Sequence, residues 1–209
     1  MKESLNDRLI ELYAASGVYT RFYVKARRRL LNFSLYDKLL PPHGVLIDVG
    51  CGCGALANYL SLRFPKSQVV GIDMDPKRIA IASKTVGERR NISFLTEDVR
   101  KWPLPACSGV VMTDFLHHVS RQDQELLLHK AFLSLEEGGV LVISEVDASA
   151  KPFYRYWASY LSDLILYFSK SHFRNAYDWH NTLSHLGFDV EIVRTWNPLF
   201  APLLLVCRR

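Results

Sequence analysis

Short apolar runs alternate with amphipathic segments through the middle of the chain. Continuous apolar residues predict buried strands at 45–49, 68–73, 92–95, 109–113 and 140–144. Between them, helical spacing predicts helices over 54–64, over 76–86 and over a segment from Leu126 to Leu135, which Glu137-Gly138-Gly139 closes. Strands separated by helices in this way indicate a parallel, doubly wound sheet.

The start of the chain predicts two helices before this sheet. Ser4, with Asp7 three residues later, is typical of a helix N-cap. A second helix is expected over 22–40, where leucines and aromatic residues supply an apolar face. Pro41-Pro42-His43-Gly44 would stop it.

The end of the chain predicts a hairpin. A helix over 176–186 ends in Gly187-Phe188, and two β-like runs follow at 188–196 and 199–207. Their short connection indicates an antiparallel pair. The predicted fold is therefore α/β, a doubly wound, mostly parallel seven-stranded sheet with a C-terminal antiparallel hairpin and helices on both faces.

Candidate chemistry lies where the first strand ends. Asp48 closes that strand, and Gly50, Gly52 and Gly54 follow at every second position. Glycine suits a backbone that adopts positive φ or approaches a ligand closely. The second strand ends in Asp73, near the spacing at which an acid meets a nucleoside ribose. These residues predict a cofactor that contains a nucleoside.

Two kinds of cofactor fit the glycines. Gly50-x-Gly52-x-x-Ala55 is acceptable for NAD. Asp48, however, would repel a pyrophosphate at the following helix N-terminus, whereas it suits the amino group and sulfonium of S-adenosylmethionine. Three further features favour the second cofactor: the acid pair Glu97-Asp98 after strand three, the polar run Asp114–His118 after strand four, and Gly187-Phe188 before the terminal hairpin.

Together these segments resemble the class I S-adenosylmethionine-dependent methyltransferases, which have a Rossmann-like fold. The resemblance spans about 44–147 and the last 35 or so residues. It implies that Asp48, Gly50, Gly52 and Gly54 line the methionine end of the cofactor. It also implies Asp73 on the ribose hydroxyls, Met74 against the adenine, the Asp98 side chain and Val99 N–H at the adenine edge, and Asp114 beneath the sulfur.

Several of these residues have simpler explanations. Gly54 would also allow close packing of a helix on a strand, and Asp98 would also serve as a turn acid. We favour Asp75 as the N-cap before Pro76. Cys53 replaces the small hydroxyl or alanine usual in the family, and no metal site is expected because no second pair with ligand spacing follows Cys51-x-Cys53.

Composition limits the setting of this domain. The chain has 209 residues, of which 49% are hydrophobic, and its net charge is +5. We expect a helical cap over 1–43 and a methyltransferase domain over 44–209, with 148–175 as a substrate-cover insert. Two of the four cysteines lie in the glycine turn, which a disulfide would distort. With the absence of a run of about 18 apolar residues and the lack of a signal-like N-terminus, this predicts a cytoplasmic protein.

The charge is unevenly distributed. The flanking segments 1–44 and 148–209 are basic, and the central block is slightly acidic. The densest run, Lys25-Ala26-Arg27-Arg28-Arg29, is typical of a solvated helix face. It also suits an anionic substrate, a phosphate-bearing carrier or peripheral contact with an anionic membrane.

The expected reaction is methyl transfer to a small molecule. A protonated acceptor would need a general base, for which His117 and His118 are the candidates, with Glu145 and Asp147 as others. Aromatic residues with basic edges in 151–174 favour an apolar, aromatic or lipid-like acceptor bearing a negative group. No base-handling motif supports a nucleic-acid substrate. The alternatives are an RNA or protein methyltransferase, a non-catalytic nucleoside-binding module and an NAD-binding oxidoreductase, and the oligomeric state stays open.

Overall fold

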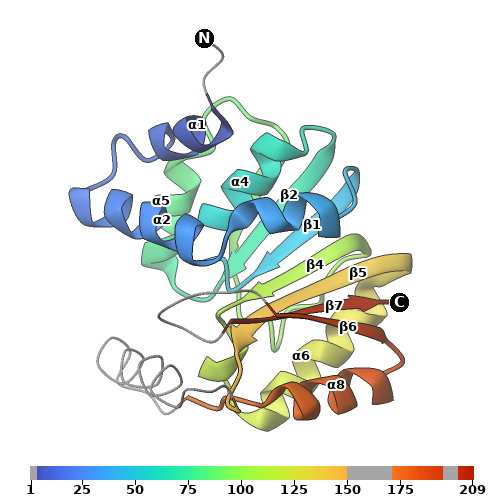
Figure 1. Ribbon diagram of the computed structural model, residues 1–209. Helices are drawn as coiled ribbons and strands as arrows, with labels where there is room; N and C mark the ends of the chain where they lie inside the picture. Colours follow the sequence, from blue (N-terminus) through green and yellow to red (C-terminus); the bar gives the residue numbers. More distant parts are fainter. Residues whose placement is uncertain (1–3, 150–170, 195–201) are drawn as a thin grey trace.

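A seven-stranded sheet forms the centre of the molecule (Figure 1). The computed structural model describes residues 4–149, 171–194 and 202–209. The strands lie in the order β3-β2-β1-β4-β5-β7-β6, and β7 alone runs in the direction opposite to the other strands. Their bounds are β1 Gly44–Val49, β2 Ser67–Asp73, β3 Ile92–Thr96, β4 Cys107–Thr113, β5 Leu135–Val146, β6 Asp189–Arg194 and β7 Pro202–Arg208.

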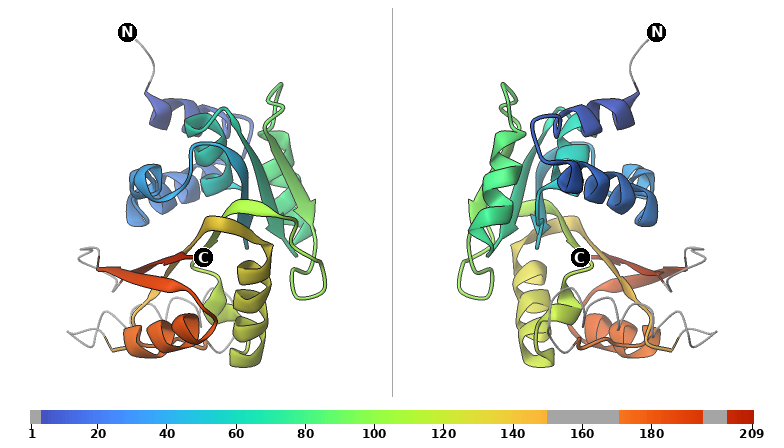
Figure 2. Two further views of the ribbon diagram at one scale, coloured as in Figure 1. Left: turned by 90° about the vertical axis from the view of Figure 1, so that its right-hand side faces the viewer. Right: turned by 90° about the vertical axis from the view of Figure 1, so that its left-hand side faces the viewer.

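Alternating strand residues build two separate cores. In β1, Leu46 packs with the N-terminal helices on one face, and Ile47 packs with the later helices on the other. Strands covered on both faces become continuous apolar runs, which is why the sequence predicts them. Both views in Figure 2 place α1 and α2 on the side of the sheet away from α6.

The helices divide between the two faces as a doubly wound fold requires. On the first face lie α1 Leu5–Glu11, α2 Val18–Leu30, the short 3-10 helix η1 Phe33–Leu35, α3 Tyr36–Leu39, α4 Ala55–Arg63 and α5 Pro76–Lys84. On the second lie α6 Arg121–Ser134 and α8 Ala176–His185. The sheet, its parallel strands and its terminal hairpin confirm the predicted fold class.

Two predicted boundaries are wrong. The helix expected over 22–40 is broken, because Asn32 adopts a left-handed conformation (φ 43°) and ends α2. This break turns the buried Phe33 and Tyr36 into the core. The helix expected to contain Leu135 ends at Ser134, and Leu135 instead opens β5 and pairs with Cys107. The aromatic segment expected to cover the substrate lies outside the described residues except for 171–174.

The N-terminal helices are bonded to the central sheet and its turns. The buried Tyr13 Oη donates to the carbonyl oxygen of Cys53, in the glycine turn, over 2.8 Å. Tyr13 Oη in turn accepts from Asn58 Nδ2 on α4 over 2.8 Å. Tyr36 Oη lies 3.1 Å from Thr113 Oγ1 at the end of β4. The helical segment before the sheet therefore supports the turns in which the candidate site residues lie.

Replacing Tyr13 with Phe tests this support. The variant leaves the buried Cys53 carbonyl without its donor, so we expect unfolding to become easier by about 1–3 kcal/mol. Urea denaturation measures the change. Tyr19→Phe is the matched control because Tyr19 is exposed on α2, and it should leave stability unchanged. Equal stability of the Tyr13 and Tyr19 variants would contradict the supporting role.

Candidate active site

The candidate site lies at the carboxyl ends of β1, β2, β3 and β4, where the sheet order reverses direction. The turn between β1 and α4 is left-handed at each alternate residue, with φ of 72° at Gly50, 56° at Gly52 and 78° at Gly54. Side chains disfavour this conformation, so the glycines are required by the backbone path. The N–H groups of Gly50 and Cys51 both donate to Ile72 O, at 2.8 and 3.0 Å.

Asp73 joins this turn to the next helix. Its Oδ2 accepts from Gly52 N–H over 2.8 Å, and its Oδ1 accepts from Asp75 N–H over 2.9 Å. Asp75 in turn accepts from Lys77 N–H and Arg78 N–H at the start of α5, which confirms it as an N-cap. The half-buried Asp73 carboxylate thus holds two backbone segments beside one cavity.

That cavity has a volume of about 280 Å³, close to the lower end of ligand pockets. Its walls come from four strand ends and the start of α6. Lining it are Gly50, Ile72, Asp73, Met74, Glu97, Asp98, Val99, Arg100, Phe115, His118, Val119, Ser120 and Asp123. The cavity therefore brings together five of the nine residues expected at the cofactor, and one of the two expected bases.

Asp98 lines the cavity while bonded to Arg100. Arg100 Nε and Nη2 donate to the two Asp98 oxygens, each over 2.9 Å, and Arg100 N–H donates to Oδ1. These hydrogen bonds lower the pKa of Asp98, so its carboxylate is a charged acceptor at the cavity wall. Asp98 therefore fulfils the turn role that the sequence left open and also faces the cavity.

Asp48 is a buried acid beneath the turn. Its side chain is 3% exposed, and Oδ2 accepts from Ala57 N–H in the first turn of α4 over 3.1 Å. Burial raises the pKa of Asp48 from 3.8 to about 7, although the Ala57 bond and the charge of Arg27 oppose this shift. Ionising Asp48 without a cation nearby is therefore costly.

Gly50 and Gly54 are also required by their neighbours. A Cβ on Gly50 would lie 2.4 Å from the Phe115 ring, and one on Gly54 would lie 2.6 Å from the Phe94 ring. Gly54 thus allows the close packing of a helix on a strand that the sequence analysis gives as its simpler explanation. A Cβ on Gly52 would meet only Arg78 Nη1, at 4.0 Å.

Asp114 is bound by a cation from the N-terminal helices. Arg27 Nη1 forms a short ion pair with Asp114 Oδ2, and Arg27 Nη2 donates to Thr113 O over 3.1 Å. Asp114 itself has a strained φ of 53°, a conformation that non-glycine residues rarely adopt. Burial raises the pKa of Asp114, but the charges of Arg27 and His117 outweigh that effect and lower it.

A second, smaller cavity of about 20 Å³ lies beside this ion pair. It is lined by Tyr23, Arg27, Phe33, Asp48, Gly50, Cys51, Ala55, Leu56 and Thr113. Gly50 lines both cavities and so lies between them. Among the described residues, Gly52, Gly54 and Asp114 line neither cavity, although all three adjoin residues that do.

The two histidines occupy different environments. His117 is 1% exposed, and its Nδ1 lies 2.6 Å from Glu145 Oε2 at the end of β5. The other Glu145 oxygen accepts from the N–H groups of Phe115 and Leu116, at 3.1 and 2.7 Å. Glu145 therefore holds the loop after β4, with His117 buried within it, whereas His118 lines the larger cavity.

Sequence reasoning missed the role of Arg27. The basic run was interpreted mainly as a solvated face, but Arg27 lies three residues after the buried Val24 and shares its inward side of α2. That spacing could have separated Arg27 from its neighbours. Within the part of the chain that the structure describes, no group of three His, Cys, Asp or Glu side chains could hold a metal ion.

The central part of the chain is similar to known methyltransferases. Residues 46–139 match the family described as "Methyltransferase domain". The chain is 30% identical over 103 residues to carboxy-S-adenosyl-L-methionine synthase of Chromohalobacter salexigens, covering 47% of this chain and 38% of that protein. It is 31% identical over 137 residues to trans-aconitate 2-methyltransferase of Variovorax paradoxus, covering 65% and 51%. The chain thus spans about half or less of these relatives.

Solved structures share the fold over more of the chain. Human N-acetylserotonin methyltransferase in complex with S-adenosylmethionine superposes with a TM-score of 0.68 and 20% identity, covering 99% of this chain and 56% of that one. A methyltransferase dependent on S-adenosylmethionine from Mesorhizobium loti gives 0.69 and 22%, covering 84% and 96%. These likenesses establish the fold that the sequence predicts.

The buried Asp48 predicts a pH-dependent stability. Between pH 3.8 and about 7, the folded protein holds a proton on Asp48 that the unfolded chain releases. Stability should therefore fall as pH rises through this window, by up to about 1.4 kcal/mol per pH unit. Asp48→Asn, which keeps an acceptor for Ala57 N–H, should flatten this part of the profile.

Thermal unfolding at several values from pH 5 to 8 measures this profile. Asp189→Asn, a change at an exposed acid on β6, is the control and should keep the wild-type slope. A slope in Asp48→Asn as steep as in the wild type would show that another group titrates in this range.

Proposed function

We propose that this chain, in which residues 46–139 form a class I S-adenosylmethionine-dependent methyltransferase domain, transfers a methyl group from that cofactor to a small-molecule acceptor. The observation that carries the proposal is the larger cavity, in which Asp73, Met74, Asp98 and Val99 meet beside Gly50. The Asp73 carboxylate is suited to the ribose hydroxyls, and the Asp98 carboxylate and the Val99 backbone N–H are suited to an adenine edge. The cavity volume suits the nucleoside part of the cofactor.

Asp48 supports this cofactor over a dinucleotide. It lies buried beneath the glycine turn and bonds to the first turn of α4, where a dinucleotide would place its pyrophosphate. An anion there would meet a carboxylate, whereas an ammonium group would favour the ionised form of Asp48. The nearby carboxylates of Asp73 and Asp114 make the same site favourable for a sulfonium.

The methionine end of the cofactor requires side chains to move. The small cavity beside Asp48 has room for about one water molecule, far less than an amino-acid moiety occupies. Two side chains can move to enlarge this cavity. Phe115 packs on Gly50, and Arg27 forms the ion pair with Asp114. The cofactor provides the activated methyl group when bound, and these residues would orient it and exclude water.

The acceptor is proposed to be apolar or aromatic and to carry a negative group. Arg27 supports the negative group, because this cation lines the small cavity at the expected methyl-donor end. The relative from Variovorax paradoxus also points to an acid, since its name gives trans-aconitate as its acceptor. Methylation of a small molecule is given by the name of this relative, whereas the name of the relative from Chromohalobacter salexigens gives the synthesis of a carboxylated S-adenosylmethionine.

A general base at His117 or His118 stays a prediction. His117 is buried against Glu145, so its position favours holding the loop that carries Asp114. His118 lines the larger cavity and is therefore accessible to a bound ligand. A base is needed only for an acceptor that carries a proton on its reacting atom.

The first test addresses the cofactor. Asp73→Ala should weaken S-adenosylhomocysteine binding at least about 100-fold, because a carboxylate that accepts two hydroxyl donors contributes roughly 1.5–3 kcal/mol for each. Isothermal titration calorimetry measures the loss, and NAD serves as the competing ligand. Tight NAD binding with no S-adenosylhomocysteine binding would favour the oxidoreductase alternative.

The control for this test separates binding from folding, since Asp73 also holds Gly52 and Asp75. Asp75→Asn keeps an N-cap oxygen on α5 and should leave cofactor affinity near the wild-type value. Circular dichroism should show that both variants are folded. Unchanged affinity in a folded Asp73→Ala variant would overturn the site assignment.

The second test addresses the acceptor. With radiolabelled S-adenosylmethionine, apolar and aromatic acids should show saturable turnover, whereas their neutral analogues and small polar amines should not. Arg27→Gln should raise KM for the acids about tenfold or more, since a charge-assisted hydrogen bond contributes roughly 1.5–3 kcal/mol. Arg29→Gln, on the exposed side of the same helix, is the matched control. Turnover confined to polar amines would contradict the proposed acceptor class.

A further inference from the structure

The outward face of α2 exposes a row of large apolar side chains. Val18, Tyr19, Phe22 and Leu30 are 81, 77, 70 and 40% exposed. They are four of the eight large hydrophobic side chains that are exposed among the described residues, gathered on one helix. Single exposed hydrophobic residues are ordinary, but a row along one helix marks a contact surface.

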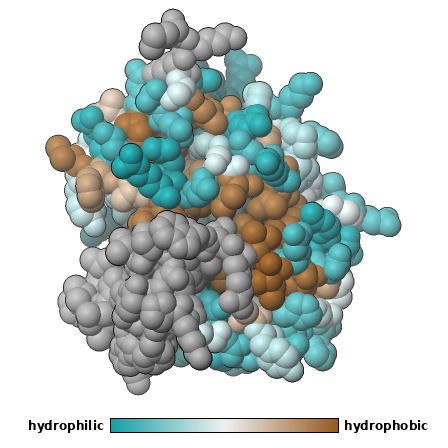
Figure 3. All heavy atoms as spheres, viewed as in Figure 1, coloured by the Kyte–Doolittle hydropathy of each residue, from teal (hydrophilic) through white to brown (hydrophobic). Residues whose placement is uncertain are grey.

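The helix is held to the rest of the fold from the side opposite this row. The helix packs inward through the buried Val24 and contacts α1 and α4. Residues 18, 22, 26 and 30 follow one another at intervals of four, so they form a single stripe turned away from Val24. Figure 3 shows hydrophobic atoms at the outer end of the region where Figure 1 places α2.

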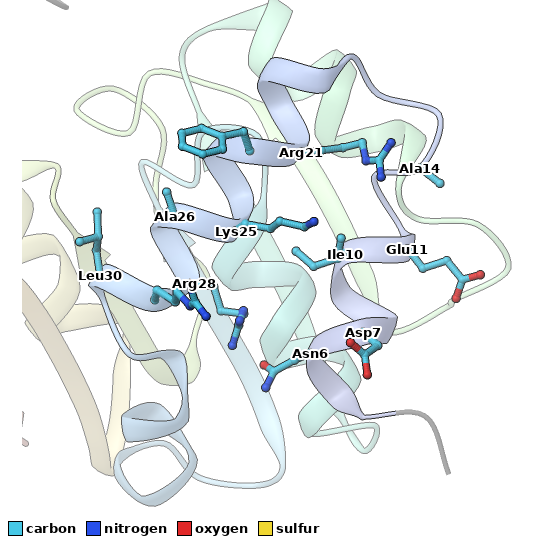
Figure 4. Close-up of a pocket in the computed structure, with 12 residues that line it drawn as sticks. Asn6, Asp7, Ile10, Glu11, Ala14, Arg21, Lys25, Ala26, Arg28 and Leu30 are labelled. Carbon is cyan, nitrogen blue, oxygen red and sulfur yellow. The ribbon is translucent and has the colours of Figure 1, made fainter. Parts of the chain in front are cut away.

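Basic side chains border the stripe. Residues 18–30 contain five cations and no Asp or Glu. Arg21, Lys25, Arg28 and Arg29 line a hollow of about 910 Å³ between α2 and α1, together with Phe22 (Figure 4). In the described part of the chain, none of these four cations forms an ion pair, although Asp7 and Glu11 lie on the α1 wall of the hollow.

We propose that α2 docks the protein on the surface of an anionic phospholipid bilayer. An apolar stripe with cations beside it matches a layer of phosphates over hydrocarbon, and long basic side chains keep their charged ends at the phosphates while their stems cover apolar surface. The stripe lies on the outer side of a helix 13 residues long, which can lie flat on a fluid surface. The basic hollow beside it can receive phosphate groups.

A second copy of the chain fits this surface poorly. A two-fold contact through α2 would bring the cations of the two α2 helices against each other. Neither copy of α2 carries an acid that would offset them. Docking on a bilayer also leaves the candidate active site open, because Arg27 reaches Asp114 from the inward side of α2. In the described residues, no helix is long and apolar enough to cross the bilayer.

Vesicle co-sedimentation of the full chain tests the proposal. Binding to vesicles of phosphatidylcholine mixed equally with phosphatidylglycerol should be strong at low salt, weaken as salt rises and be absent with phosphatidylcholine alone. Arg21→Gln combined with Lys25→Gln should weaken it about 30-fold, at about 1 kcal/mol for each cation. Tyr19→Ser combined with Phe22→Ser should weaken it at least about tenfold.

Matched controls change the same residue types elsewhere. Lys66→Gln with Lys77→Gln removes two exposed cations, and Leu133→Ser with Tyr177→Ser removes two exposed apolar side chains. Both should bind vesicles like the wild type. Absence of wild-type binding, or equal loss in control and test variants, would overturn the proposal.

Sedimentation velocity adds a second decision. A concentration-dependent dimer that the Tyr19 and Phe22 changes abolish would assign the stripe to a second copy of the chain instead. Vesicle binding that does not depend on salt would contradict the role proposed for the cations. These measurements need neither cofactor nor acceptor. Failure of the proposed methyl transfer would therefore leave their outcome intact.

Discussion

The candidate site depends on the hydrogen bonds that the Asp73 carboxylate makes to the backbone. It accepts from Gly52 in the turn after β1 and from Asp75 at the start of α5, so one side chain sets the distance between two segments that meet at the sheet edge. The glycines of the turn carry no side chains to pack and have left-handed φ values, so backbone hydrogen bonds hold it: Asp73 accepts one of them, Ile72 O accepts two, and Tyr13 donates another. The residue proposed to bind the ribose is thus also the residue that shapes the cavity.

The N-terminal helices support the site from the other side. Tyr13 donates to the Cys53 carbonyl in the glycine turn. Arg27 binds the carbonyl oxygen of the last residue of β4, Thr113, and the carboxylate of Asp114 after it. The helix that carries Arg27 inward carries the apolar stripe outward. Contacts made on the outer face of α2 are therefore linked through one rigid helix to the position of Asp114.

The sequence predicts the strands and their end residues well, because strands buried on both faces are continuous apolar runs and glycine and acid positions are local signals. Asp75 before Pro76 is such a local signal, and the structure confirms its role. Tertiary contacts decide what the sequence missed. Asn32 breaks a helix whose apolar spacing continues past it, Leu135 joins a strand because Cys107 pairs with it, and Arg27 bonds to a residue 87 positions away.

Charge explains why this edge of the sheet suits a cationic ligand. Asp48, Asp73 and Asp114 come from three neighbouring strands, and the charge of Asp73 further raises the pKa of Asp48. Arg27 offsets part of this negative charge but bonds directly to Asp114. Burial makes the ionised form of Asp48 costly, and it also strengthens the attraction of that form for any cation admitted to the cavity. An ammonium group would therefore compensate the negative charge of Asp48, which the fold alone leaves uncompensated.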